Sequence, residues 1–165
     1  MDEKISPKLL YNPICFIALV GGAGLFRRAP GTLSSIVGLV IYWFVLSHFP
    51  IRAYVAVILI SCIIGIAVCH YAAEKIGKHD HSGIGWDEVV GMWVTMTAVT
   101  DEMMWLWVMV GFVLFRLFDI YKPYPISYID RHLKGGLGIM LDDIVAGVLS
   151  CVSLHLLILV FNYIG

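Results

Sequence analysis

The stretch AYVAVILISCIIGIAVCHYAA, residues 53–73, decides the fold because it is long, apolar and free of charged side chains. As a helix rising about 1.5 Å per residue, it matches the ~30 Å hydrocarbon layer of a bilayer. Another apolar run, 32–50, precedes it, and a turn at Pro50 to Arg52 joins the two runs. The sequence therefore predicts a transmembrane helical hairpin over residues 32–73.

The composition of the whole chain also indicates a membrane protein. Hydrophobic residues make up 60% of the 165 residues and charged residues 14%, with a mean hydropathy of +0.89. Soluble domains average about 45–50% apolar and about 25% charged residues. The length suits one domain, so we expect a single domain over 1–165. A formal net charge of -1 gives no overall field that would attract nucleic acid.

Three further apolar segments extend the predicted bundle. Runs 89–100 and 103–118, separated by two acids, form a second hairpin that crosses the bilayer or only enters it, and 144–161 forms a last spanning helix. Segment 14–25 is too short and too rich in glycine to span, so we expect an interfacial or re-entrant piece. The predicted fold class is an all-α, integral-membrane helical bundle with about 3–5 membrane-embedded helices.

The order of the hairpins predicts which polar segments share a face of the membrane. Two antiparallel hairpins return the chain to the face it left, so 24–31, 74–87 and 119–143 should lie together. That face carries most of the basic residues: Arg27, Arg28, Lys75, Lys78, Lys122, Arg131 and Lys134. The opposite turns hold Arg52, Asp101 and Glu102. The positive-inside rule makes the basic face cytoplasmic.

Acidic residues cluster at the predicted helix ends on that face. Asp87-Glu88 open the third helix, Asp119 closes the fourth, and Asp142-Asp143 open the last. Capping and the helix dipole explain one acid in a first turn, but two adjacent pairs exceed that need. Converging carboxylates repel one another unless they share a cation, and oxygen ligands suit Mg²⁺, Mn²⁺ or Ca²⁺. The pattern therefore predicts a divalent-metal site.

Basic and glycine-rich segments beside these acids would complete a phosphate site. Arg116 and Asp119 stand at i,i+3, which equally fits a plain ion pair on a helix face. Lys122 follows closely and equally fits a positive-inside anchor. The glycine loop 21–31 leads to a helix start at which Thr32 would be the cap and free N–H groups could hold a phosphate. Its spacing matches no P-loop or dinucleotide motif.

Other chemistries fit the sequence less well. His79-Asp80-His81 offers imidazoles for zinc, but the neighbouring candidates are oxygen donors. The four cysteines lie in apolar runs, where we expect them to pack, and none has an arginine at the spacing of a thiol phosphatase. A cation transporter would place its acids near the bilayer midplane on broken helices. A non-catalytic membrane scaffold would release no phosphate.

Four linked motifs occur along roughly residues 20–150. They are a loop with GAG at 22–24 and APGT at 29–32, HD at 79–80 followed by WDEVVGMW at 86–93, FRLFDIYKPYPI at 115–126, and GGLGIMLDDIVAG at 135–147. Together they resemble the bacterial phosphatidylglycerophosphatase A family. The resemblance implies a Mg²⁺-dependent phosphatase of the bacterial cytoplasmic (inner) membrane, which removes the terminal phosphate of the phospholipid phosphatidylglycerophosphate to give phosphatidylglycerol.

The matching motifs also imply roles for individual residues. Expected metal ligands are Asp87, Glu88, Asp119, Asp142 and Asp143. Expected catalytic residues are Arg116, Asp119, Lys122, Asp142 and Asp143. Expected substrate contacts are Thr32, His79, Asp80, Arg116, Lys122 and Asp130. The nucleophile is either a water oriented by the metal or a carboxylate that forms an aspartyl-phosphate.

Two positions depart from the family pattern. Similar proteins usually carry uncharged residues at Arg27-Arg28 and a glycine at Ser34. The resemblance therefore assigns no role to the arginine pair, which would anchor the loop or attract anionic lipid.

Overall fold

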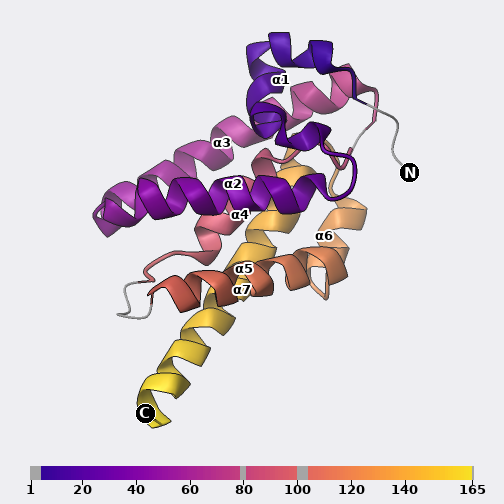
Figure 1. The fold of residues 1–165 in the computed structure, drawn as a ribbon. Coiled ribbons are helices and arrows are strands. Elements are labelled where there is room, and N and C mark those ends of the chain that lie inside the picture. Colours follow the sequence, from indigo (N-terminus) through magenta and orange to yellow (C-terminus); the bar gives the residue numbers. More distant parts are fainter. Residues whose placement is uncertain (1–4, 79–80, 100–103, 165) are drawn as a thin grey trace.

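The computed structural model describes residues 5–78, 81–99 and 104–164, which form helices and no strand. The predicted all-α class is confirmed. In chain order the elements are η1 (Pro7–Tyr11), α1 (Pro13–Ala18), η2 (Val20–Leu25), α2 (Pro30–Phe44), η3 (Leu46–His48), α3 (Ile51–Ile76), α4 (Trp86–Thr95), α5 (Met104–Tyr121), α6 (Ile126–His132) and α7 (Gly135–Ile164). Figure 1 labels α1 to α7 along the chain.

Four helical segments are long and apolar enough to cross a membrane. They are Pro30–His48, Ile51–Ile76, Met104–Tyr121 and Gly135–Ile164, and at most 33% of the most apolar window of each is buried inside the protein. Many large apolar side chains therefore point outwards, and Ile63 of α3 is 71% exposed. Such a surface suits contact with lipid. These segments correspond to the predicted hairpin and to the predicted last two spans.

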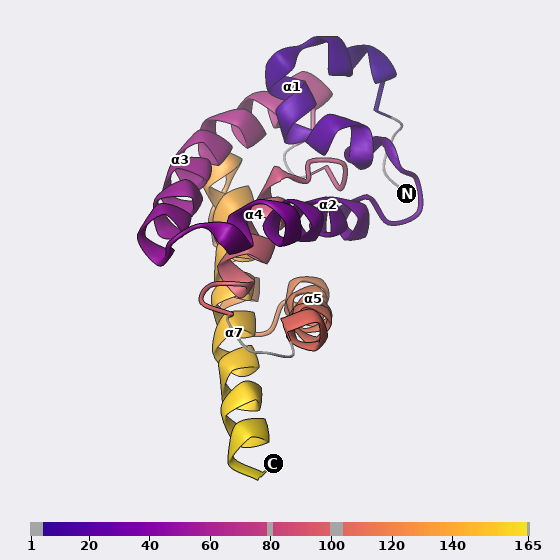
Figure 2. The same cartoon turned by 60° about the vertical axis from the view of Figure 1, so that its left-hand side comes forward.

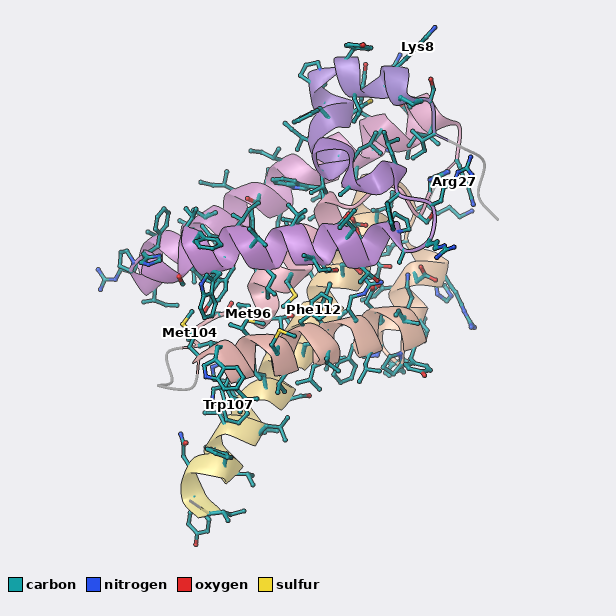
Figure 3. All side chains as sticks on the ribbon, in the orientation of Figure 1. Lys8, Arg27, Met96, Met104, Trp107 and Phe112 are labelled. Carbon is teal, nitrogen blue, oxygen red and sulfur yellow. The ribbon has the colours of Figure 1, made fainter. Side chains whose placement is uncertain are left out.

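Exposed aromatic residues lie near both ends of the long helices. Trp43 and Phe44 end α2 and Trp105 begins α5, whereas Phe26 precedes α2 and Tyr121 ends α5. Figure 3 shows the two ends, with Arg27 at one and Met104 at the other. Aromatic side chains at both ends are typical of helices that cross a bilayer.

Helix α4 is the buried centre of the bundle. It packs against α2, α3 and α7, and its Val89, Val90 and Met92 are fully buried. Its 10 residues are too few to cross a bilayer. In the predicted second hairpin, α4 is therefore too short to span by itself, whereas α5 is long enough.

The N-terminal segment 14–25 consists of most of α1 and all of η2, both too short to span, as predicted. Gly21 and Gly22 turn the chain there with φ of 64° and 107°, a region that glycine adopts without strain. The N–H of Gly85 donates to the carbonyl of Ala18 at 2.9 Å. This bond ties the N-terminal segment to the loop that enters α4.

Two glycines bring α4 and α7 into backbone contact. A Cβ at Gly91 would lie 2.8 Å from the carbonyl oxygen of Asp143. A Cβ at Gly147 would lie 2.5 Å from the carbonyl oxygen of Gly91. Close approach through small residues is a common way for membrane helices to associate. Figure 2 shows α7 running past α4 and continuing beyond the other helices. The contact fixes Asp143 beside the first turn of α4.

Candidate active site

One end of the bundle contains a pocket of about 390 Å³. The start of α2, the loop into α4 and its first turn, the end of α5, and α7 provide its walls. The lining residues are Arg28, Ala29, Pro30, Gly31, Thr32, Ser82, Ile84, Asp87, Glu88, Arg116, Asp119, Ile120, Lys122, Asp142 and Asp143. The polar segments that the hairpin order assigns to one face therefore meet at one pocket.

Three carboxylates form a tight group in this pocket. Asp87, Glu88 and Asp143 each bring one oxygen to within 4.8 Å of the others. The first two stand in the first turn of α4, and the third comes from α7. Asp87 is 7% exposed and Asp143 4%. Oxygen donors at this spacing could hold one hard divalent cation.

The environment of Glu88 disfavours its ionised form unless a positive charge lies nearby. Its Oε2 is buried and has no hydrogen-bond partner within the described part of the chain. Burial, and then the charge of Asp143, raise the pKa of Glu88 well above its usual range, although a hydrogen bond with Asp87 acts in the opposite direction. A cation among the three oxygens would favour the ionised carboxylate. The donor set therefore fits a divalent metal ion.

Arg116 and Asp119 form an ion pair on the wall of the pocket. The distance from Nη1 to Oδ2 is 2.6 Å, and the side chains are 16% and 14% exposed. The same Nη1 donates to Oγ of Ser35 in α2 at 3.3 Å, and Asp119 lines the same pocket as Asp143. The i,i+3 pair on the helix is therefore real, and it is also part of the pocket.

Lys122 connects the end of α5 to α6 and α7. Its Nζ donates to Oδ1 of Asp130 at 2.6 Å and to Oδ2 of Asp142 at 2.5 Å. Burial acts to lower the pKa of Lys122, but the two carboxylates outweigh burial and raise the pKa well above its ordinary value. The backbone φ of Lys122 is +42°, in the left-handed region that favours glycine. The fold thus holds a charged amine at the pocket wall.

Helix α2 starts earlier than the sequence predicts. It begins at Pro30 with Ala29 as N-cap, so the expectation that Thr32 caps it is wrong. Proline suits the first helical position because the N–H it lacks has no partner there. Thr32 instead lines the pocket from the first turn, and a Cβ at Gly31 would collide with Oε1 of Glu88. The positive end of the helix dipole therefore faces the acids.

The start of α7 also corrects a prediction. The helix begins at Gly135, so Asp142 and Asp143 lie about two turns inside it rather than at its start. The glycine-rich run 135–138 has the composition of a loop, but Gly136 packs against the carbonyl of Ile66, where no side chain fits. Capping explains neither acid.

The histidine motif divides between described and undescribed residues. His79 and Asp80 lie outside the described residues, so their substrate contacts stay predictions. His81 is 5% exposed, and its Nδ1 accepts a hydrogen bond from the N–H of Gly83 at 3.0 Å. In the part of the chain that the structure describes, no histidine belongs to the carboxylate group. The zinc alternative gains no support.

Sequence reasoning missed Gly31 and Ser35 as neighbours of the acids and Arg116. Ser35 Oγ donates to the carbonyl of Gly31 at 2.9 Å and accepts from Arg116. The available signal was their spacing, because residues four apart share a helix face. Ser34, the departure from the family pattern, is buried and donates from Oγ to the carbonyl of Pro30 at 3.1 Å.

The fold and the pocket together define an integral-membrane helical bundle. Its site, at the ends of the helices, is lined by acidic side chains and by the side chains of arginine and lysine residues. A family model described as Phosphatidylglycerophosphatase A matches residues 16–158. The chain belongs to this family of phosphatases, and the resemblance seen in the motifs is confirmed.

Three relatives show how far the similarity extends. The Escherichia coli K12 protein named Phosphatidylglycerophosphatase A is 42% identical over 155 residues, covering 93% of this chain and 88% of its own. The Haemophilus influenzae protein of the same name is 37% identical over 150 residues, covering 91% and 90%. A Bacteroides thetaiotaomicron protein with the provisional name phosphatidylinositol-3-phosphatase is 36% identical over 137 residues, covering 78% and 83%. No solved structure matches the chain.

Proposed function

We propose that this protein hydrolyses the terminal phosphomonoester of phosphatidylglycerophosphate, with Mg²⁺ as cofactor, and releases phosphatidylglycerol and inorganic phosphate. The observation that carries the proposal is the meeting of three clustered carboxylates with the cationic side chains of Arg116 and Lys122 in one pocket at the end of the membrane helices. The names of the family and of two relatives supply the substrate.

Asp87, Glu88 and Asp143 are the residues that would hold Mg²⁺. Carboxylate ligands suit this ion, which usually binds through few carboxylates and keeps several waters. When bound, Mg²⁺ would polarise the phosphoryl oxygens and orient an attacking water. Asp119 and Asp142, also expected as ligands, pair with Arg116 and Lys122. We therefore assign these two acids to the surroundings of the ion.

The side chains of the chain itself would position the phosphate and move protons. Arg116 and Lys122 neutralise the phosphoryl oxygens as negative charge develops on them. A water oxygen bonds to phosphorus, the bond from phosphorus to the glycerol oxygen breaks, and that oxygen takes up a proton. Asp119 is the carboxylate proposed to accept the proton of the water. In the second route a carboxylate attacks first, and water then hydrolyses the aspartyl-phosphate.

A lipid substrate suits the position of the pocket. Its acyl chains would stay in the bilayer while its headgroup enters at the helix ends, where Ile120 and Tyr121 are 65% and 77% exposed. We further propose that the membrane is the bacterial cytoplasmic (inner) membrane and that the pocket faces the cytoplasm. The support is the basic character of the segments at this end.

A cation transporter, the alternative from another class, is not favoured. It would need acids midway along interrupted helices, whereas α3, α5 and α7 are continuous and the acids line a pocket at one end of the bundle.

Phosphate release from phosphatidylglycerophosphate in neutral detergent micelles tests the proposal. The purified protein should release phosphate with Mg²⁺ or Mn²⁺, stop when EDTA is added, and recover when the metal is restored in excess. Full activity in metal-free buffer would contradict the cofactor. No release with any divalent ion would contradict the function and leave the transporter or a non-catalytic scaffold.

A further inference from the structure

Arg28 differs from the other two cations of the pocket. Arg116 is paired with Asp119, and Lys122 with Asp130 and Asp142. Arg28 lines the same pocket, yet no ion pair or hydrogen bond joins it to any residue that the structure describes. Its positive charge is therefore available to a ligand.

Among the three cations that line the pocket, Arg28 is the one in the exposed class. It is exposed, whereas Asp87 and Asp143 are buried. It lies three residues before Gly31, the residue that abuts Glu88, and two residues after Phe26, which is 56% exposed. An exposed aromatic side chain beside cations is typical of the interface between lipid and water. Arg28 is thus an exposed cation of the pocket lining, close along the chain to the residue that abuts Glu88 and to an exposed aromatic side chain.

The proposed substrate carries a second phosphate that this position would suit. Its reacting phosphomonoester belongs beside Arg116 and Lys122, and a glycerol separates it from the phosphodiester that carries the acyl chains. The phosphodiester keeps a negative charge and two free oxygens, which match the fork of a guanidinium group. Resting on the proposed function, we propose that Arg28 binds this phosphodiester and selects lipids that carry it in addition to the phosphomonoester.

Two lipids and three variants test this role. Phosphatidylglycerophosphate has both phosphates, and phosphatidic acid has only the phosphomonoester. Arg28→Gln should lower the kcat/KM ratio of the first lipid over the second by about tenfold or more, mainly through KM, because a charge-assisted bond is lost. Arg28→Lys should restore part of the ratio. Arg27→Gln is the matched control, since Arg27 is exposed but does not line the pocket.

A binding measurement separates this proposal from the proposed function. Phosphatidylglycerol, which has only the phosphodiester, should bind about tenfold more weakly to Arg28→Gln than to Arg27→Gln in neutral micelles, whether or not either protein turns over substrate. If the wild type hydrolyses neither phosphorylated lipid, the proposed function fails while this readout still tests Arg28. An unchanged ratio, an equal loss on both lipids, or the same effect from Arg27→Gln would overturn the role of Arg28.

Discussion

Asp143, like its neighbour Asp142, is an acid whose position local helix chemistry cannot explain. It lies about two turns inside α7, and its carboxylate is buried next to those of Asp87 and Glu88. Buried like charges destabilise a fold unless an opposite charge compensates them. The simplest compensation here is a bound divalent cation. If Asp143 holds such an ion, its substitution should lower activity without lowering the stability of the metal-free protein.

Asp143→Asn should therefore abolish the linkage between metal and stability. Mg²⁺ that binds only the folded protein, at about 100 times its Kd, adds about 2.7 kcal/mol and raises Tm on the order of 5–10 °C. We expect this rise in the wild type but not in Asp143→Asn, whose phosphatase activity should fall more than about 100-fold, since even indirect partners of a metal cost 10–100-fold. Without metal, its Tm should equal or exceed that of the wild type, because one repulsive charge is gone.

Glu74→Gln is the control for this prediction. Glu74 is an exposed acid of α3 outside the pocket, and its Oε1 lies 3.6 Å from Nε2 of His70. Its removal should therefore leave the rise in Tm with Mg²⁺ intact. A full Mg²⁺-dependent rise in Asp143→Asn would rule out Asp143 as a ligand.

At the scale of elements, the length of the apolar runs explains what the sequence predicts, and glycine contacts explain what it misses. Long apolar runs identify the spanning helices because length and composition alone determine whether a helix suits a bilayer. The start of α7 is missed because glycine disfavours a helix by about 1 kcal/mol, whereas Gly136 is needed where α7 meets the carbonyl of Ile66. Tertiary contacts of this kind leave no local pattern in the chain.

Gly31 and Gly91 should respond differently to substitution by alanine. At Gly31 the added Cβ meets the movable carboxylate of Glu88, and at Gly91 it meets the backbone of Asp143 and the ring of Phe115. Gly31→Ala should reduce activity at least about tenfold while Tm stays within about 3 °C, because alanine favours the helix and Glu88 can move. Gly91→Ala should lower stability by about 1–3 kcal/mol through overpacking.

Activity assays and thermal unfolding of both variants check this contrast. Normal activity in Gly31→Ala would show that the position of the Glu88 carboxylate does not matter for catalysis. An unchanged Tm in Gly91→Ala would show that α4 and α7 can separate without loss.

At the scale of the molecule, the order of the hairpins already predicts which polar segments meet. Residues near 30, 87, 119 and 142 line one pocket because antiparallel helices return the chain to the same end. The sequence does not separate the acids into three that cluster and two that pair with cations. That division depends on side-chain directions and on the close contact of α4 with α7.

The sidedness of the membrane is the remaining prediction, and it rests on charge and on the hairpin order alone. In a variant without its four cysteines, Tyr124→Cys should resist an impermeant thiol reagent in intact cells and react after permeabilisation. Arg52 lies near the start of α3, at the end of that helix away from the pocket. Arg52→Cys should therefore react in intact cells. Both positions are exposed, so a difference in labelling reports the side of the membrane rather than burial. The result does not depend on how deep segment 89–118 goes, because a segment that crosses the bilayer and returns and one that only enters it both leave Tyr124 on the same side. Labelling of Tyr124→Cys from outside would show the chain to be inverted and would remove the pocket from the cytoplasmic supply of Mg²⁺.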